Sequence, residues 1–146
     1  MLSNSCRYGI RAMVYIASQP MENGNSGIKK ISSDLNLPTP YLAKILQQLA
    51  KQKILSSAKG PYGGFSLLKD PKKITLLDIV VSIDGDGIFT DCVMHNGSCT
   101  TIDKTKKPCP LHADYEATRK DMIKLFSNKS IHDLVKRAHS SDLITI

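Results

Sequence analysis

A glycine-rich segment, Ala58–Gly64, constrains the fold of this chain more than any other feature of the sequence. Its three glycines and one proline permit a sharp turn and a close backbone approach to another surface. The segments on either side, Ile54–Ser57 and Phe65–Leu68, can each form a short strand. We therefore predict a β-hairpin. A nucleotide-binding loop is disfavoured, because no helix follows the glycines to offer its N-terminus to a phosphate.

Two helices joined by a tight turn precede this hairpin. A short helix is expected from about Ser32 to Asn36, with Ile31 and Leu35 facing inward. The Pro-Thr-Pro sequence at residues 38–40 then forces a turn, because proline disfavours helix in the residue before it and suits the next helix's first turn. Helix, turn, helix and hairpin in this order predict a winged helix-turn-helix; a plain surface hairpin is the alternative. The second helix runs to about Gln52 on the apolar positions Leu42, Ile45, Leu46 and Leu49.

The helix after the turn has an outward face suited to DNA. Hydrogen-bond donors or cations, and no carboxylate, occupy its outward positions Thr39, Tyr41, Lys44, Gln47, Gln48 and Lys51. The base edges and phosphates of a major groove favour such groups. The residues that we predict to contact DNA are Thr39, Pro40, Tyr41, Lys44 and Gln48 on this helix, and Lys59 and Tyr62 at the hairpin tip.

The positive charge of the chain is concentrated in the same half. The net charge is +7, and residues 1–66 contain eight Lys or Arg against two acidic residues. The remaining residues contain twelve basic and eleven acidic side chains, which nearly cancel. This asymmetry is typical of a phosphate-binding face, although a generally basic surface would also produce it.

The fold class is therefore mainly α with a small β wing. We divide the chain into a winged helix-turn-helix at residues 1–84, a loop at residues 85–110 and a helical region at residues 111–146. The loop shows neither helical nor strand periodicity from about residue 84, and its length is unusual in a compact domain unless it is functional or disordered. Further helices are expected at about Asn4–Ser18, from Thr75 to Gly85 or Gly87, at about Leu111–Phe126, and after Ser130.

Three of the four cysteines lie in this loop. They are Cys92, Cys99 and Cys109, and His112 follows the last of them closely. Thiolates and an imidazole on a flexible loop can close around zinc or an iron–sulfur cluster. Their spacing matches neither a paired-CxxC zinc ribbon nor a ferredoxin motif, so reduced cysteines without a metal stay an alternative. Cys6, far from the others in the sequence, is predicted to be a small buried residue.

The sequence favours a cytoplasmic protein that is not an enzyme. No apolar run approaches the roughly 20 residues needed to cross a membrane. Arg7 and Arg11 interrupt the apolar N-terminal stretch, so it does not resemble a signal peptide. A thiol oxidoreductase using the loop cysteines is disfavoured, because the chain has no CxxC and no convincing acid–base pair.

These residues together resemble the IscR/NsrR-type family of bacterial winged-helix transcription regulators. The similarity extends over nearly the whole chain, and a loop with three cysteines followed by a long helix is its second diagnostic feature. The most specific stretches are Arg7-Tyr8-Gly9, Ile31-Ser32 through Tyr41-Leu42, Leu46, Leu49, Ser56-Ser57 and Lys59–Phe65.

The resemblance implies a homodimer built on the helix at residues 111–126. Its two winged helix-turn-helix units, called reading heads below, would bind a partly symmetric double-stranded DNA operator. It also implies that the loop at 85–110 holds a [2Fe-2S] cluster, whose ligands would be Cys92, Cys99, Cys109 and His112. Loss or oxidation of the cluster would reorganise the loop and change the spacing of the two heads.

Some residues depart from the family pattern. The gap between Cys99 and Cys109 is longer than in IscR-like members. Arg7 replaces the acidic ligand that NsrR-like members take from the first helix, and Ala43 replaces a glutamate of IscR-like recognition helices. Some members bind no cluster, so a regulator that responds to zinc, a partner protein or a metabolite is the alternative function.

Overall fold

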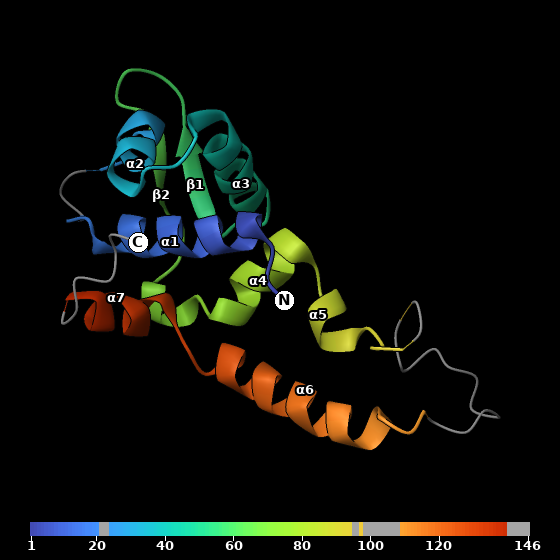
Figure 1. The fold of residues 1–146 in the computed structure, drawn as a ribbon. Helices are drawn as coiled ribbons and strands as arrows, with labels where there is room; N and C mark the ends of the chain where they lie inside the picture. Colours follow the sequence, from blue (N-terminus) through green and yellow to red (C-terminus); the bar gives the residue numbers. More distant parts are fainter. Residues whose placement is uncertain (21–23, 95–96, 98–108, 140–146) are drawn as a thin grey trace.

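The computed structural model describes residues 1–20, 24–94, 97 and 109–139, and these residues are mostly helical (Figure 1). One two-stranded antiparallel sheet is present among them. In chain order the elements are α1 (Asn4–Ser18), α2 (Ile28–Leu35), α3 (Thr39–Lys51), β1 (Leu55–Ala58), β2 (Gly64–Leu67), the 3₁₀ turn η2 (Pro71–Lys73), α4 (Leu76–Asp84), α5 (Gly87–Thr90), α6 (His112–Ser127) and α7 (Ile131–His139).

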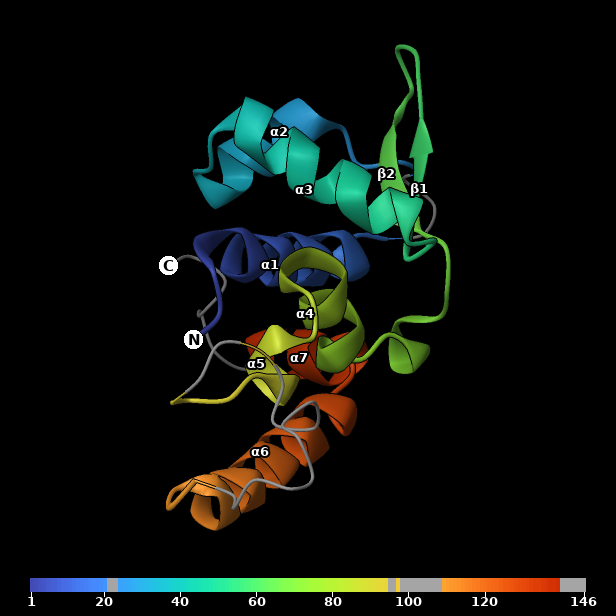
Figure 2. The same ribbon diagram turned by 90° about the vertical axis from the view of Figure 1, so that its right-hand side faces the viewer.

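Helix α1 is the centre of the core. It begins after Ser3, whose hydroxyl accepts a hydrogen bond from the Cys6 N–H at 3.0 Å. Helices α2 and α3 cover one side of α1, and α4 and α7 cover the other (Figures 1 and 2). Ala12 and Met13 of α1 are fully buried between these layers. A Cβ atom added at Gly9 would lie 2.3 Å from Ile83 Cδ1, so α1 and α4 pack very closely there.

Two hydrogen-bonded junctions fix α4 and α7. Thr75 and Asp78 form a capping box, in which the Asp78 N–H donates to Thr75 Oγ1 and the Thr75 N–H donates to the Asp78 carboxylate. The start of α7 pairs with the segment before α4 through the Ile131 N–H and the Ile74 carbonyl oxygen, at 2.9 Å. Helix α6 extends away from the body formed by α1–α4 (Figures 1 and 2).

Most of the predicted elements are confirmed, and two predictions are wrong. The helix predicted at Ser32–Asn36 begins at Ile28, because Gly27 takes an extended backbone that ends the preceding loop and Ile28 packs on the core. The segment predicted to be irregular from residue 84 contains α5. Phe89 is buried there beside Phe126 of α6, and this packing stabilises a turn too short for a periodicity signal.

Candidate nucleic-acid interface

The turn between α2 and α3 is closed by backbone and hydroxyl hydrogen bonds. Asn36 has a left-handed backbone, with φ of 52°, and the N–H of Leu37 returns to the Ser32 carbonyl oxygen at 2.9 Å. The Ser32 hydroxyl also lies 2.7 Å from the Thr39 hydroxyl, at the first residue of α3. These contacts set the angle between the two helices. Thr39, predicted to contact DNA, is therefore half-buried in this turn.

Helix α3 has one buried and one exposed face, as its sequence predicts. Its apolar stripe is buried against α1 and the sheet, and the opposite face is exposed. Pro40 and Lys44 lie on this exposed face, and no hydrogen bond or ion pair within the described residues engages the Lys44 ammonium. The exposed residues from one end of α3 to the other are Pro40, Tyr41, Lys44, Gln47, Gln48 and Lys51.

Two residues of the exposed face bind the rest of the protein. The Tyr41 hydroxyl lies 2.6 Å from the Ser5 hydroxyl, and its ring meets Tyr8 edge-on with 5.8 Å between centroids. Gln48 donates from Nε2 to the carbonyl oxygens of Ser82, at 2.8 Å, and Ile83, at 3.3 Å. Tyr41 thus connects α3 to α1, while Gln48 connects α3 to the last turn of α4. The sequence did not reveal these contacts, because they join residues far apart in the chain.

The hairpin predicted from the glycine-rich segment is present, and it projects beyond α2 and α3 at one end of the molecule (Figures 1 and 2). Leu55 pairs with Leu67, and Ala58 pairs with Gly64. Lys59 is exposed at its tip, and Tyr62 is 92% exposed. A fully exposed tyrosine beside a lysine is available to a partner surface, because nothing in the described fold covers it.

The hairpin also pairs with a residue that the sequence left in a loop. The N–H of Ser26 donates to the Phe65 carbonyl oxygen at 2.8 Å, and the Phe65 N–H donates to the Ser26 carbonyl oxygen at 2.9 Å. Gly64 makes this approach possible: its φ is 141°, and a Cβ there would lie 2.3 Å from the Ser26 carbonyl oxygen. Asn25 adds a hydrogen bond to the Tyr62 carbonyl oxygen at 3.3 Å. Strand β2 and the tip of the wing are thus tied to the segment before α2.

The predicted metal ligands are only partly described. Cys92, Cys109 and His112 are each half-buried, whereas Cys99 lies outside the described residues. The His112 N–H donates to the Cys109 carbonyl oxygen at 3.0 Å, which places these two at the start of α6. Within the described ranges no three His, Cys, Asp or Glu side chains gather as a metal site would require. The donors are soft thiols and an imidazole, so their chemistry fits a cluster.

A buried arginine that the sequence did not single out is bonded to the residue before Cys92. Arg119 of α6 is only 5% exposed, and its Nη2 donates to the Asp91 carbonyl oxygen at 2.9 Å. Its Nη1 donates to Glu116 at 2.9 Å, and its guanidinium lies 4.9 Å from the centroid of the Tyr115 ring. The spacing of Tyr115, Glu116 and Arg119 on one helix was visible in the sequence, but the burial was not.

Comparison with protein families gives a match over residues 2–137, to the Rrf2 family, described as an iron-dependent transcriptional regulator. A protein of Aquifex aeolicus named as an HTH-type transcriptional regulator is 31% identical over 134 residues, which are 91% of this chain and 90% of the relative. The HTH-type transcriptional regulator IscR of Klebsiella pneumoniae is 27% identical over 142 residues, which are 97% of this chain and 83% of that protein. These relatives are named as regulators and not as enzymes.

Solved structures share the fold. The structure of CymR, the global cysteine regulator of B. subtilis, aligns with a TM-score of 0.78 and 24% identity, covering 94% of this chain and 97% of CymR. The structure of T. potens IscR aligns with a TM-score of 0.73 and 23% identity, covering 98% of this chain and 91% of that chain.

No helix in the described part of the chain is long and apolar enough to cross a bilayer.

Proposed function

Since this chain belongs to the Rrf2 family of DNA-binding transcription regulators, we propose that it acts as a homodimer whose operator binding is modulated by a [2Fe-2S] cluster. The observation that carries the DNA-binding part is the exposed face of α3 beside a projecting wing. Lys44 on α3 and Lys59 on the wing are both exposed, and no carboxylate occurs on the outward face of α3. Such a surface attracts phosphate and offers donors to base edges.

The predicted DNA contacts have different roles in this proposal. Lys44 and Lys59 bind phosphates, Tyr62 at the tip reaches the minor groove or backbone, and Pro40 lies at the start of the reading helix. The hydroxyl of Thr39 lies against the Ser32 hydroxyl, so it contributes chiefly by fixing the turn. Tyr41 and Gln48 combine an exposed surface with the bonds to α1 and α4 described above.

A salt titration tests the DNA contacts. A duplex is first selected from a random library by the wild-type protein, and its affinity is then measured between 50 and 200 mM salt, a range in which phosphate contacts have a strong effect. Lys44→Ala and Lys59→Ala should each weaken binding and reduce the salt slope by about one unit. Lys120→Ala, an exposed lysine on α6, is the control. Unchanged slopes for both test variants would contradict the proposed face.

Helix α6 supports the homodimer. Leu111 and Leu125 are 43% and 54% exposed, and they lie on one helical stripe with Tyr115 and Met122. Apolar residues at this spacing form the seam between paired helices. Leu125→Lys should therefore convert a dimer into a monomer in sedimentation equilibrium. A wild-type protein that sediments as a monomer at micromolar concentration would contradict this part of the proposal.

The ligand chemistry and the family description support the cluster. Cys92, Cys99, Cys109 and His112 would hold it, and when bound it would supply a redox-sensitive site between α5 and α6. Arg119 fixes the backbone at Asp91, directly before the first of these ligands. A change in the conformation of the loop would then be transmitted to α6 through this bond, and a shift of α6 would change the spacing of the two reading heads.

Anaerobic purification with iron, sulfide and zinc analysis tests the cluster. Iron and sulfide in near-equal amounts, with visible absorption that disappears in Cys99→Ser, are expected. Cys6→Ser is the matched control, because Cys6 is fully buried in the core and should not affect the spectrum. Zinc alone or no metal would contradict the cluster and favour the second function, a regulator of the same fold that responds to zinc, a partner protein or a metabolite.

A further inference from the structure

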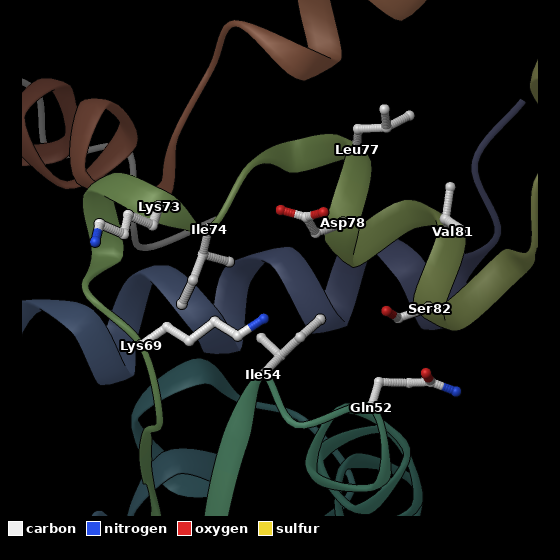
Figure 3. A pocket seen from close by; sticks show the side chains of 9 residues that line it. All are labelled: Gln52, Ile54, Lys69, Lys73, Ile74, Leu77, Asp78, Val81 and Ser82. Carbon is white, nitrogen blue, oxygen red and sulfur yellow. The ribbon is translucent and has the colours of Figure 1, made fainter.

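A pocket of about 350 Å³ lies between the base of the wing and α4 (Figure 3). This volume is within the range of small-molecule sites, roughly 300–1,000 Å³. Its lining contains no cysteine and none of the predicted DNA contacts. Its walls come from the connection between α3 and β1, the segment after β2, η2 and α4. The lining residues are Gln52, Ile54, Lys69, Lys73, Ile74, Leu77, Asp78, Val81 and Ser82.

The floor of the pocket is apolar, and one cation is directed over it. Ile54 and Ile74 are buried at its floor, and Val81 remains 42% exposed on the α4 side. The Lys69 side chain extends over Ile54 into the pocket, whereas Lys73 lies at the edge and points away (Figure 3). An ammonium above an apolar floor favours an anion that carries an apolar body.

The charges around the pocket favour a single negative group. Asp78 is the one carboxylate of the lining, and its Oδ2 accepts hydrogen bonds from the N–H and the hydroxyl of Thr75 at 2.9 and 2.8 Å. It therefore serves the cap of α4. No ion pair within 4.0 Å joins it to Lys69 in the described part of the chain. A doubly charged phosphate would meet this carboxylate with only one lysine directed inward, so a monocarboxylate matches the site better.

We propose that this pocket binds a small organic carboxylate, whose apolar body lies on Ile54 and Val81 and whose carboxylate pairs with Lys69. The site is independent of the cluster. Its effect on DNA, however, rests on the proposed DNA-binding function.

The pocket contacts both parts of the reading head. The Leu68 N–H donates to the Ile54 carbonyl oxygen at 3.1 Å. Ile54 directly precedes β1, and Lys69 follows Leu68 just after β2, so both lie at the base of the wing. On the other side, the carbonyl oxygen of Ser82 accepts the hydrogen bond from Gln48 of α3. A bound carboxylate would stabilise one arrangement of wing, α3 and α4, and thereby shift the population of DNA-binding conformations.

Nuclear magnetic resonance of the ¹⁵N-labelled full chain tests the binding. Hexanoate should cause saturable shifts of the backbone amides of Ile54 and of residues 77–82. Lys69→Ala should weaken this binding about tenfold, the size expected for a hydrogen bond to a charged group. Lys72→Ala removes an equal charge from an exposed residue outside the lining and should bind as the wild type does. Val81→Phe should fill the pocket and abolish the shifts.

Two ligand controls make the test decisive. Hexanamide has the same length without the charge, and it should bind the wild type about as weakly as hexanoate binds Lys69→Ala. Inorganic phosphate should leave the amides of Ile54 and residues 77–82 unchanged. Equal hexanoate binding by the wild type and Lys69→Ala, or equal shifts with phosphate, would overturn the proposal.

A DNA measurement separates this inference from the proposed function. The affinity of the wild type for the selected duplex is measured first without hexanoate and then at saturation. If hexanoate changes the DNA affinity of the wild type but not that of Val81→Phe, the result supports coupling between the pocket and DNA binding. A wild type that binds DNA equally in both conditions contradicts the coupling alone, whereas a wild type that binds no DNA contradicts the proposed function.

Discussion

Arg119 Nη2 donates to the backbone carbonyl oxygen of Asp91 at 2.9 Å, which ties the middle of α6 to the residue directly before Cys92. The two residues are 28 positions apart in the sequence, and the segment between them contains all of the loop cysteines. Phe89 and Phe126 add a second contact between α5 and α6, with ring centroids 5.7 Å apart. The ends of the cysteine segment are thus held together by packing and hydrogen bonding within the chain itself.

Replacing Arg119 by Ala should destabilise the fold by about 1.5–3 kcal/mol, because it removes buried hydrogen bonds of a charged group. Hydrogen exchange should also accelerate at the amides of residues 87–92, since the Asp91 backbone loses its anchor. Lys120→Ala is the control: its ammonium is exposed and 3.7 Å from Glu116, so the change should cost less than about 0.5 kcal/mol. Urea unfolding measures both variants. Equal unfolding free energies would show that the Asp91 bond does not stabilise the fold.

Gly64→Ala should destabilise the wing more than Gly60→Ala. Both glycines have positive φ, at 141° and 103°, so both substitutions introduce backbone strain. Only Gly64 also faces a backbone atom, the Ser26 carbonyl oxygen, at 2.3 Å from an added Cβ. We expect about 1 kcal/mol for Gly60→Ala and at least about twice this for Gly64→Ala, measured by urea unfolding. Similar losses at both positions would contradict the importance of the pairing with Ser26.

The sequence predicted the reading head well because its signals are local. The apolar stripe of α3, the Pro-Thr-Pro turn before it and the glycines of the hairpin each determine structure within a few residues. The helix expected to begin at Thr75 likewise depends on a local signal, because Thr75 caps α4. The start of α2 and the whole of α5 were missed, because Ile28 and Phe89 stabilise them through packing with distant residues.

The candidate sites were less predictable, since they depend on contacts across the fold. Gln48 looked like a solvent-facing donor in the sequence, yet its amide binds the carbonyl oxygens of α4. Arg119 was not among the predicted site residues, yet it is buried and bonded to the backbone before Cys92. The pocket beside α4 draws its lining from the α3–β1 connection, the segment after β2, η2 and α4, so no short sequence window contains it. The prediction for Cys99 lies outside the described residues and stays a prediction.

Gln48→Ala should weaken DNA binding without changing its salt dependence. The side chain holds α3 against the last turn of α4 and carries no charge, so its loss loosens the orientation of the reading helix but releases no counterion. A loss of about threefold to tenfold in affinity is expected, corresponding to one hydrogen bond. Gln47→Ala, the neighbouring exposed residue, is the control for changes in helix propensity. A reduced salt slope in Gln48→Ala would contradict this role.

Cys6 should resist alkylation in the folded protein. It is fully buried, and burial, together with the nearby charge of Asp84, raises the pKa of its thiol to about 12. Because the thiolate is the reactive form, iodoacetamide at pH 8 should modify Cys6 only after unfolding. Peptide mass spectrometry of the metal-free protein after labelling in buffer and in urea gives the comparison, with the half-buried Cys109 as the internal reference. Rapid native labelling of Cys6 would show that the α1–α4 contact opens readily.

Stability at low pH should depend on Asp34. Hydrogen bonds from the Tyr15 hydroxyl and the Lys30 ammonium, at 2.5 and 2.9 Å, hold the pKa of Asp34 below its ordinary value of 3.8. A carboxyl group whose pKa falls on folding contributes stability that is present above 3.8 and is lost as the pH falls through the lower, folded value. The free energy of unfolding of the wild type should therefore fall more steeply below pH 4 than that of Asp34→Asn. Urea titrations between pH 2 and 6 measure this difference, and Asp121→Asn, an exposed carboxylate on α6, is the control. If the free energy of unfolding falls equally steeply below pH 4 in the wild type and in Asp34→Asn, the Tyr15–Asp34 bond between α1 and α2 adds no pH-dependent stability.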